Sequence, residues 1–329
     1  MTSGTLVMRR VLYALAPAAI VHTWFFGYGF VLNFAAAALA ALLAEATILR
    51  IRGRQSRRAL RDGSALVTAA LLVFAIPPLV PGWIPAFGAA VAVVLGKHLY
   101  GGLGRNLFNP AMVGYAFLLI SFPVEMTQWV PPRMGDIDYQ HLGFVQHLGY
   151  TFTGELPANL GVDALTRATP LDIVREGIRA GRSFAQTRTG SLFGDFGGRG
   201  WEWINNFIAL GGLYLLYTST IRWHIPAAVL AGLLVPALAL NLAEPDRFAP
   251  ASFHLFSGAT LLGAFFIATD PVSAATTDRG RLIYGAAIGV LTYAIRTWGG
   301  YPDGFAFAVL LMNASVPLID RFTRTRVYG

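Results

Sequence analysis

Residues 64–78 form an apolar run, Ser64-Ala-Leu-Val-Thr-Ala-Ala-Leu-Leu-Val-Phe-Ala-Ile-Pro-Pro78, and residues 257–271 align with it without a gap, as Ser257-Gly-Ala-Thr-Leu-Leu-Gly-Ala-Phe-Phe-Ile-Ala-Thr-Asp-Pro271. Two shorter matches follow in the same order: residues 87–93 with 284–290, and residues 100–102 with 298–300. The three offsets are 193, 197 and 198 residues. Because order and spacing persist, we interpret the chain as a duplication of one apolar helical unit.

Similar apolar runs recur along the whole chain, which is 55% hydrophobic and only 13% charged. A soluble domain has about 25% charged residues, and a helix needs about 20 apolar residues to cross a bilayer. We therefore predict an all-α integral membrane protein with about ten spans, at residues 11–29, 31–49, 64–80, 84–99, 107–124, 204–221, 224–242, 253–269, 281–297 and 304–320.

Basic residues predict the orientation, because cytoplasmic segments of membrane proteins are enriched in Lys and Arg. With a cytoplasmic N-terminus, the cytoplasmic segments hold sixteen basic residues, and the short outer segments hold two, Arg247 and Arg296. This predicts cytoplasmic N- and C-termini and a periplasmic loop at residues 125–203, in the inner membrane of a bacterium. The net charge of +8 is thus explained by residues that flank spans, and nucleic acid is not a predicted partner.

The predicted topology makes the two repeats antiparallel, because the third and eighth spans correspond but cross in opposite directions. The predicted units are a first membrane half at residues 1–124, the loop at 125–203, and a second membrane half at 204–329, with five spans in each half. Inverted repeats of this kind commonly hold a site at their interface. Two interpretations stay open: a pathway or cofactor pocket between the halves, or a scaffold whose symmetry is only ancestral.

The centre of the long loop contains a predicted helix start. Thr169 suits the N-cap, Pro170 suits the first helical position, and Asp172 places an acid in the first turn. The helix is predicted to end near Gly181. On local grounds alone, capping explains Thr169 completely.

The same segment, Asp163-x-x-Thr166-Arg167-Ala168-Thr169, resembles the flavinylation motif Asp-x-x-Ser/Thr-Gly-Ala-Thr. In proteins with that motif, a periplasmic flavin transferase joins FMN through its phosphate to the last threonine. The resemblance implies covalent FMN on Thr169, with Asp163, Thr166 and Ala168 as motif residues. A phosphoester on an N-cap is compatible with capping, because free backbone N–H groups there form an anion site. Arg167 stands where the motif has Gly, and two consequences are open: hindrance of the transferase, or pairing with the phosphate.

The ten-span layout, the length, the loop before the sixth span and the run Phe265–Pro271 resemble the family of the D subunits of Rnf electron-transport complexes. This family is related to the B subunits of sodium-translocating NADH:quinone reductases. The resemblance implies an oxidoreductase subunit that passes electrons within a membrane complex coupled to proton or sodium transport. It implies partner subunits with iron–sulfur clusters and flavin, and it allows a second, non-covalent flavin such as riboflavin.

Several other residues have competing explanations. Ser257-Gly-Ala-Thr260 has the core of the flavinylation motif, but His254 replaces its Asp, and close helix packing explains the small residues better. Asp270 and Glu45 lie near span ends, where they could bind a cation or relay protons, or could simply cap a helix. His22 lies inside the first span, where we expect a hydrogen bond to a neighbouring helix.

The chain has no cysteine and its six histidines are scattered, so we predict no metal site and place iron–sulfur clusters in partners. No general acid–base pair or nucleophile triad is apparent, so we do not expect the chain to be catalytic alone. The alternative function is a secondary transporter or channel built on the same repeat. That alternative needs no cofactor and accounts for Asp270, but it leaves the segment from Asp163 to Thr169 as a coincidence.

Overall fold

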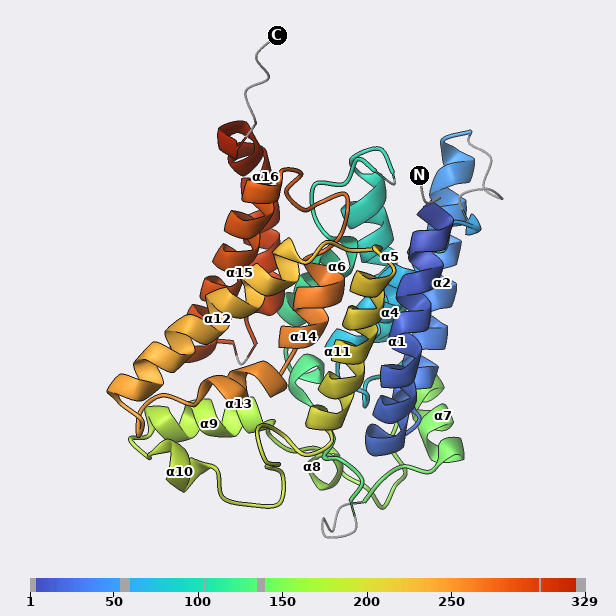
Figure 1. Ribbon diagram of the computed structural model, residues 1–329. Coiled ribbons are helices and arrows are strands. Elements are labelled where there is room, and N and C mark those ends of the chain that lie inside the picture. The colour runs from blue at the N-terminus through green and yellow to red at the C-terminus, as the bar shows by residue number, and fades with distance from the viewer. Residues whose placement is uncertain (1–3, 54–59, 103, 135–139, 302, 324–329) are drawn as a thin grey trace.

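The computed structural model describes residues 4–53, 60–102, 104–134, 140–301 and 303–323. In these ranges the regular structure is helical, and the β-structure amounts to two isolated bridges. Helical residues occupy each of the ten predicted spans (Figure 1). In chain order these helices are α1 (Gly4–Phe26), α2 (Gly29–Ile51), α4 (Ser64–Ala75), α5 (Trp83–Val91) continued by the π-helix η1 (Ala92–His98), α6 (Pro110–Ser121), α11 (Trp201–Tyr217), α12 (His224–Ala243), α13 (Ala251–Phe256), α14 (Thr260–Leu262) continued by the π-helix η3 (Gly263–Ile267), α15 (Asp278–Trp298) and α16 (Phe305–Thr323).

Length and composition make four of these helices, α1, α2, α12 and α16, suitable for crossing a membrane. Shorter apolar helices accompany them, at Ser64–Ala75, Trp83–His98 and Pro110–Ser121. Apolar side chains face outward along the bundle, such as Ile20 and Leu39, which are 71% and 61% exposed. A bundle of this kind is a multi-pass membrane protein.

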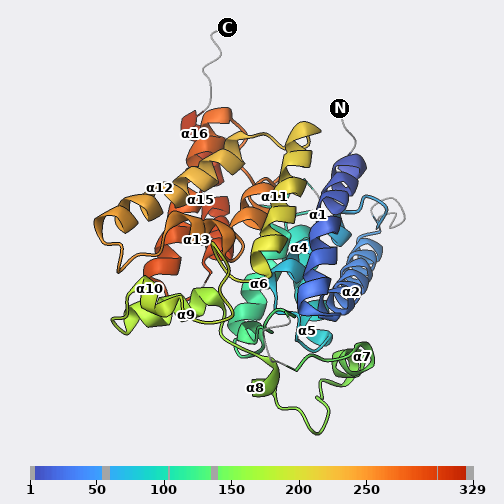
Figure 2. The same cartoon turned by 60° about the horizontal axis from the view of Figure 1, so that its bottom comes forward.

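The long loop between the halves gathers at one end of the bundle. It contains η2 (Glu125–Thr127), α7 (Phe144–Thr153), α8 (Val162–Leu165), α9 (Pro170–Arg179) and α10 (Phe184–Thr187). Figures 1 and 2 show α7–α10 together at the bottom, whereas α1 begins and α16 ends at the opposite, upper end.

The two halves are interlocked. Helix α11 of the second half lies along α1 of the first (Figures 1 and 2). The approach is close because a Cβ on Gly211 would lie 2.3 Å from the backbone oxygen of Ala14, and small residues allow such backbone contact. At a second junction, the backbone N–H of Asn109 donates to Oδ1 of Asn313 at 2.9 Å.

The predicted span 253–269 is broken, so its prediction as one continuous helix is wrong. Helix α13 ends at Phe256 and α14 begins at Thr260, and Gly258 between them has φ +61°. A left-handed residue interrupts the helical hydrogen-bond ladder. The matching run of the first half begins as a helix at Ser64 without such a break.

Helix α7 packs on the start of α2 through His147. A Cβ on Gly29 would lie 2.7 Å from Cε1 of His147, so the ring rests directly on that glycine. Burial lowers the pKa of His147 to about 4. The nearby Pro78 backbone opposes this shift, and the charge of Arg133 adds to it.

We expect α7 to detach from the bundle as the pH falls from about 6.5 to about 4. Between about pH 6.5 and pH 4, the His147 imidazole binds a proton when α7 is detached but not when α7 is packed. The packed state therefore has its full stability above about pH 6.5 and loses up to roughly 3 kcal/mol of it as the pH falls to about 4. Hydrogen-exchange protection of residues 144–153, compared at pH 7 and pH 4.5, measures the effect. His147→Asn removes the titrating group and should flatten this pH dependence, whereas equal protection of the wild-type helix at both pH values would contradict the expectation.

Candidate functional site: a capped threonine at an internal cavity

The predicted N-cap is confirmed, because Thr169 begins helix α9. Its Oγ1 accepts from the backbone N–H of Asp172 at 3.2 Å and donates to Asp172 Oδ2 at 2.7 Å. The same carboxylate accepts the backbone N–H of Thr169 at 3.3 Å, and Pro170 is the first helical residue. These reciprocal bonds satisfy N–H groups that a helix start leaves without partners.

The four residues of the predicted flavinylation motif lie on one continuous segment that leads to this cap. Asp163 belongs to the short helix α8, Thr166 follows this helix as its C-cap, and the chain then runs extended to Thr169. Asp163 and Ala168 are exposed, and Thr169 is half-buried. A modifying enzyme could therefore reach the segment from outside the bundle.

The departure from the motif, Arg167, folds back onto helix α8. Its Nη1 donates to the backbone oxygens of Asp163 at 2.7 Å and Thr166 at 3.0 Å. Its own backbone N–H donates to the oxygen of Trp129 at 2.8 Å. The guanidinium is thus engaged by backbone oxygens of its own segment.

Thr169 lines an internal cavity of about 530 Å³, a size typical of small-molecule sites. The walls come from both halves of the chain and from the loop. The first half supplies mostly apolar side chains, such as Phe74, Met112 and Leu119. Aromatic rings also face the cavity, and they belong to Tyr115, Trp129, Trp201, Tyr301 and Phe305.

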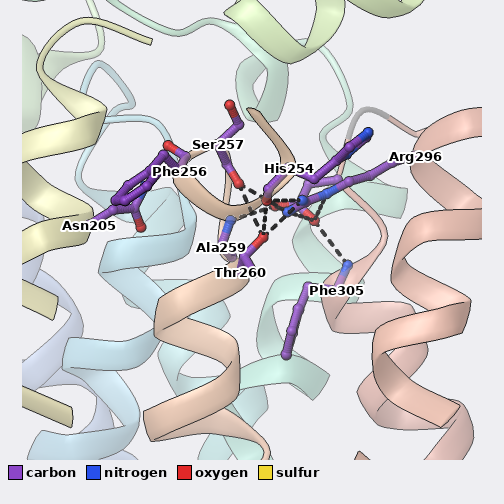
Figure 3. A network of polar contacts seen from close by, with 9 residues as sticks. Asn205, His254, Phe256, Ser257, Ala259, Thr260, Arg296 and Phe305 are labelled. Carbon is purple, nitrogen blue, oxygen red and sulfur yellow. Dashed lines mark hydrogen bonds and ion pairs between the residues drawn. The ribbon is translucent and has the colours of Figure 1, made fainter. Parts of the chain in front are cut away.

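A buried arginine, Arg296, organises the wall that the second half contributes (Figure 3). Its guanidinium donates to Asp303 at 3.1 Å, to Thr260 Oγ1 at 2.8 Å, and to the backbone oxygens of His254 and Ser257 at 2.9 and 3.2 Å. The side chain of Arg296 is 1% exposed and that of Asp303 is 20% exposed. Asp303 therefore presents a partly open carboxylate to the cavity, with its counter-charge behind it.

The same carboxylate fixes the break between α13 and α14. It accepts the backbone N–H of Ala259 at 2.7 Å and that of Phe305 at 3.1 Å. A Cβ on Gly258 would lie 2.3 Å from Asp303 Oδ2, so this turn requires glycine. The broken helix and the loop before α16 thus form one rigid wall.

Two further polar groups lie on this wall (Figure 3). Asn205 Nδ2 donates to the backbone oxygen of Phe256 at 2.9 Å. Ser257 Oγ is buried and has no hydrogen-bond partner among the described residues. An unsatisfied buried hydroxyl beside a cavity is a group that a bound polar ligand can satisfy.

The second motif-like threonine, Thr260, is inaccessible. It is 0% exposed, and its hydroxyl donates to the backbone oxygen of His254 at 2.7 Å while accepting from Arg296. A modifying enzyme cannot reach this hydroxyl without unfolding the wall, so Thr169 and not Thr260 is the candidate site.

Helix α9 is tied to the second half at the mouth of the cavity. Arg175 Nη1 donates to the backbone oxygen of Gly300 at 2.9 Å, and Arg179 Nη2 donates to that of Gly299 at 2.6 Å. Arg175 Nη2 also lies 3.6 Å from Asp172 Oδ1. Thr169 is thereby held at a fixed place relative to the wall.

The other single residues resolve differently. His22 has no hydrogen-bond partner among the described residues, so the prediction of a hydrogen bond to a neighbouring helix is wrong. Aromatic rings surround its imidazole instead, and the ring centroids of Phe30 and Trp201 lie 4.8 and 5.8 Å away. Glu45 forms a buried ion pair with Lys97 at 2.5 Å. Asp270 accepts the backbone N–H of Val272 at 2.9 Å, as a local cap does.

The polar wall was missed by reasoning from the sequence. The sequence pattern places Arg296 only among the outer basic residues and does not point to Asp303 or Asn205. One signal is present: Arg296 is the only charged residue between Ile283 and Thr297, and a charge within an apolar helix needs a buried partner.

The apolar helices define a multi-pass membrane protein, and the cavity between its two sequence halves is a candidate ligand site. The family described as NQR2, RnfD, RnfE matches residues 2–329, and this chain belongs to that family. It is 52% identical over 328 residues to the D subunit of the ion-translocating oxidoreductase complex of Aeromonas salmonicida, covering 98% of this chain and 94% of that protein. Its identity to the protein of the same name from Vibrio cholerae is 51% over 330 residues, with the same coverage.

Proposed function

We propose that this chain is the membrane subunit of an ion-translocating oxidoreductase complex and carries FMN covalently on Thr169. The observation that carries the proposal is the position of Thr169, which ends the motif segment and also lines the 530 Å³ cavity. Helix capping alone does not require a threonine to face such a cavity. The family membership and the names of the relatives support the oxidoreductase role.

The residues around the cavity fit a flavin. The start of α9 offers the positive end of a helix dipole to a phosphate on Thr169. Tyr115, Trp129, Trp201 and Tyr301 offer flat apolar faces for a fused ring system, and Ser257 and Asn205 offer hydrogen bonds to its polar edge. Bound FMN supplies reversible electron transfer, while the protein sets its position, its access to water and its electrostatic environment.

The proposed topology places about ten spans in a bacterial inner membrane as two inverted five-helix repeats. The loop 125–203 lies in the periplasm and both termini lie in the cytoplasm. The bias of basic residues supports this, as does the separation of α7–α10 from the start of α1 and the end of α16 (Figure 1). In this orientation the exposed motif segment faces the periplasmic flavin transferase.

The proposed partners are the other subunits of the complex, with their iron–sulfur clusters and flavins, since this chain has no cysteine for binding clusters. Electron passage between them is coupled to transport of a cation. The relatives are named as subunits of an ion-translocating complex, which supports the assembly. A second, non-covalent flavin such as riboflavin stays a prediction of the family resemblance.

In-gel flavin fluorescence tests the proposal. The full chain is co-expressed with a periplasmic flavin transferase, denatured, separated on a gel and illuminated with ultraviolet light. We expect a fluorescent wild-type band that is lost completely in Thr169→Asn. Asparagine is an N-cap at least as good as threonine but has no hydroxyl, so the variant separates flavin attachment from helix capping.

Two further variants complete this experiment. Thr169→Ser keeps a hydroxyl and should stay fluorescent, and Thr260→Val should also stay fluorescent because Thr260 is buried. A dark wild-type band beside a fluorescent reference flavoprotein would overturn the proposal and favour a transporter or channel without a cofactor.

A further inference from the structure

The hydroxyl of Thr169 is already bonded to a carboxylate. Thr169 Oγ1 donates its proton to Asp172 Oδ2 at 2.7 Å, and both residues line the cavity. Among the described residues, no hydrogen bond joins Thr169 to the motif residue Asp163. Asp172 is therefore the acid in contact with the hydroxyl that the proposed function modifies.

We propose that Asp172 is the general base for flavin attachment to Thr169, so that the acceptor chain supplies a catalytic group for its own modification. This inference rests on the proposed function. The bond from Thr169 Oγ to the phosphorus of a flavin nucleotide forms as that phosphorus loses its phosphoanhydride bond. The leaving nucleotide keeps the electron pair, the hydroxyl proton passes to Asp172 and then to water, and nothing is oxidised or reduced.

The chemistry requires such a group, because a threonine hydroxyl is a weak nucleophile until a base takes its proton. A base must lie within about 2.6–3.2 Å of the proton donor, and Asp172 Oδ2 does. Transfer of the proton also neutralises Asp172 as the negative phosphodiester forms beside it. Arg175, 3.6 Å from Asp172 Oδ1 and only 14% exposed, then provides the positive charge that faces the product.

A second capping box in the same loop shows what capping alone needs. Ser183 Oγ accepts from the backbone N–H of Gln186 at 3.2 Å, and Gln186 Oε1 accepts from the backbone N–H of Ser183 at 2.9 Å. Here the third helical residue is a neutral amide, which caps a helix but does not accept a proton. The N-cap residues of the two boxes have nearly the same backbone angles, and only the first box places a carboxylate beside the capping hydroxyl.

This difference supplies the matched variant, Asp172→Gln, which converts the first cap into the second type. The full chain in detergent is mixed with purified flavin transferase, its divalent metal and a flavin dinucleotide. The initial rate of labelling is followed by in-gel fluorescence at neutral pH. We expect Asp172→Gln to lower this rate by about 100-fold or more. Asp172→Glu keeps a carboxylate and should restore most of the rate, and Gln186→Leu in the second box should leave it unchanged.

Three outcomes decide the inference. Slow labelling of Asp172→Gln with recovery in Asp172→Glu supports it. Equal rates for wild type and Asp172→Gln overturn it and leave Asp172 as a cap, with the proposed function intact. A dark wild-type chain overturns the proposed function and this inference together.

Discussion

Replacing Arg296 by methionine is expected to destabilise the protein by about 3–5 kcal/mol, the usual effect of removing one partner of a buried ion pair. Methionine fills much of the same volume, so lost packing is a minor part. The larger part comes from the groups left behind: the Asp303 carboxylate, the Thr260 hydroxyl and the backbone oxygens of His254 and Ser257. Each is buried or partly buried, and each loses a charged donor.

The expected effect is measured by thermal unfolding of the purified protein in detergent, followed by tryptophan fluorescence. Arg296→Lys is the control, because it keeps the charge but has no planar fork for several acceptors at once. Its stability should fall between those of wild type and Arg296→Met. A methionine variant as stable as wild type would mean that water forms hydrogen bonds with the acceptors that lose Arg296, and that the wall is not rigid.

The positions of the apolar helices along the chain could be predicted from the sequence because the apolar character of a segment is the sum of contributions that each residue makes independently. The cap at Thr169 was also predictable, since Thr169, Pro170 and Asp172 are adjacent and act on one helix end. The break at Gly258 was not. It depends on Asp303, which lies 45 residues later and becomes a neighbour only in the folded chain.

The same limit applies to the basic residues. Lys97 and Arg296 both look like charges that flank spans, yet as whole residues they are only 2% and 4% exposed. A basic residue near the end of an apolar helix can point to the lipid headgroups or into the bundle. Sequence position does not distinguish these cases, because the partner acid comes from another element: Glu45 for Lys97, and Asp303 for Arg296.

Replacing Lys97 by methionine is expected to cost about 3–5 kcal/mol, because Glu45 would keep a buried charge without its counter-ion. Glu45 is 1% exposed, and its Oε2 has no hydrogen-bond partner among the described residues even with Lys97 present. Lys97 Nζ also donates to Ser64 Oγ at 2.7 Å, so its loss unties the start of α4 as well. Thermal unfolding in detergent measures the loss.

A double-mutant cycle separates the ion pair from the packing of its members. Glu45→Gln together with Lys97→Met leaves no charge unpaired, so the double variant should be more stable than the sum of the single losses predicts, by about 1–3 kcal/mol. The exposed pair Arg247–Glu244, at 3.4 Å, is the reference, and its cycle should give a coupling near zero because water screens both charges. Additive losses at Glu45 and Lys97 would mean that the pair behaves like a surface pair and that water reaches this end of the bundle. A clear coupling would mean that water does not reach the pair of Glu45 and Lys97. Lys97 donates to Ser64 at the start of α4, and Arg296 donates to Ser257 and Thr260 at the start of α14. Each repeated stretch thus begins beside a buried cation.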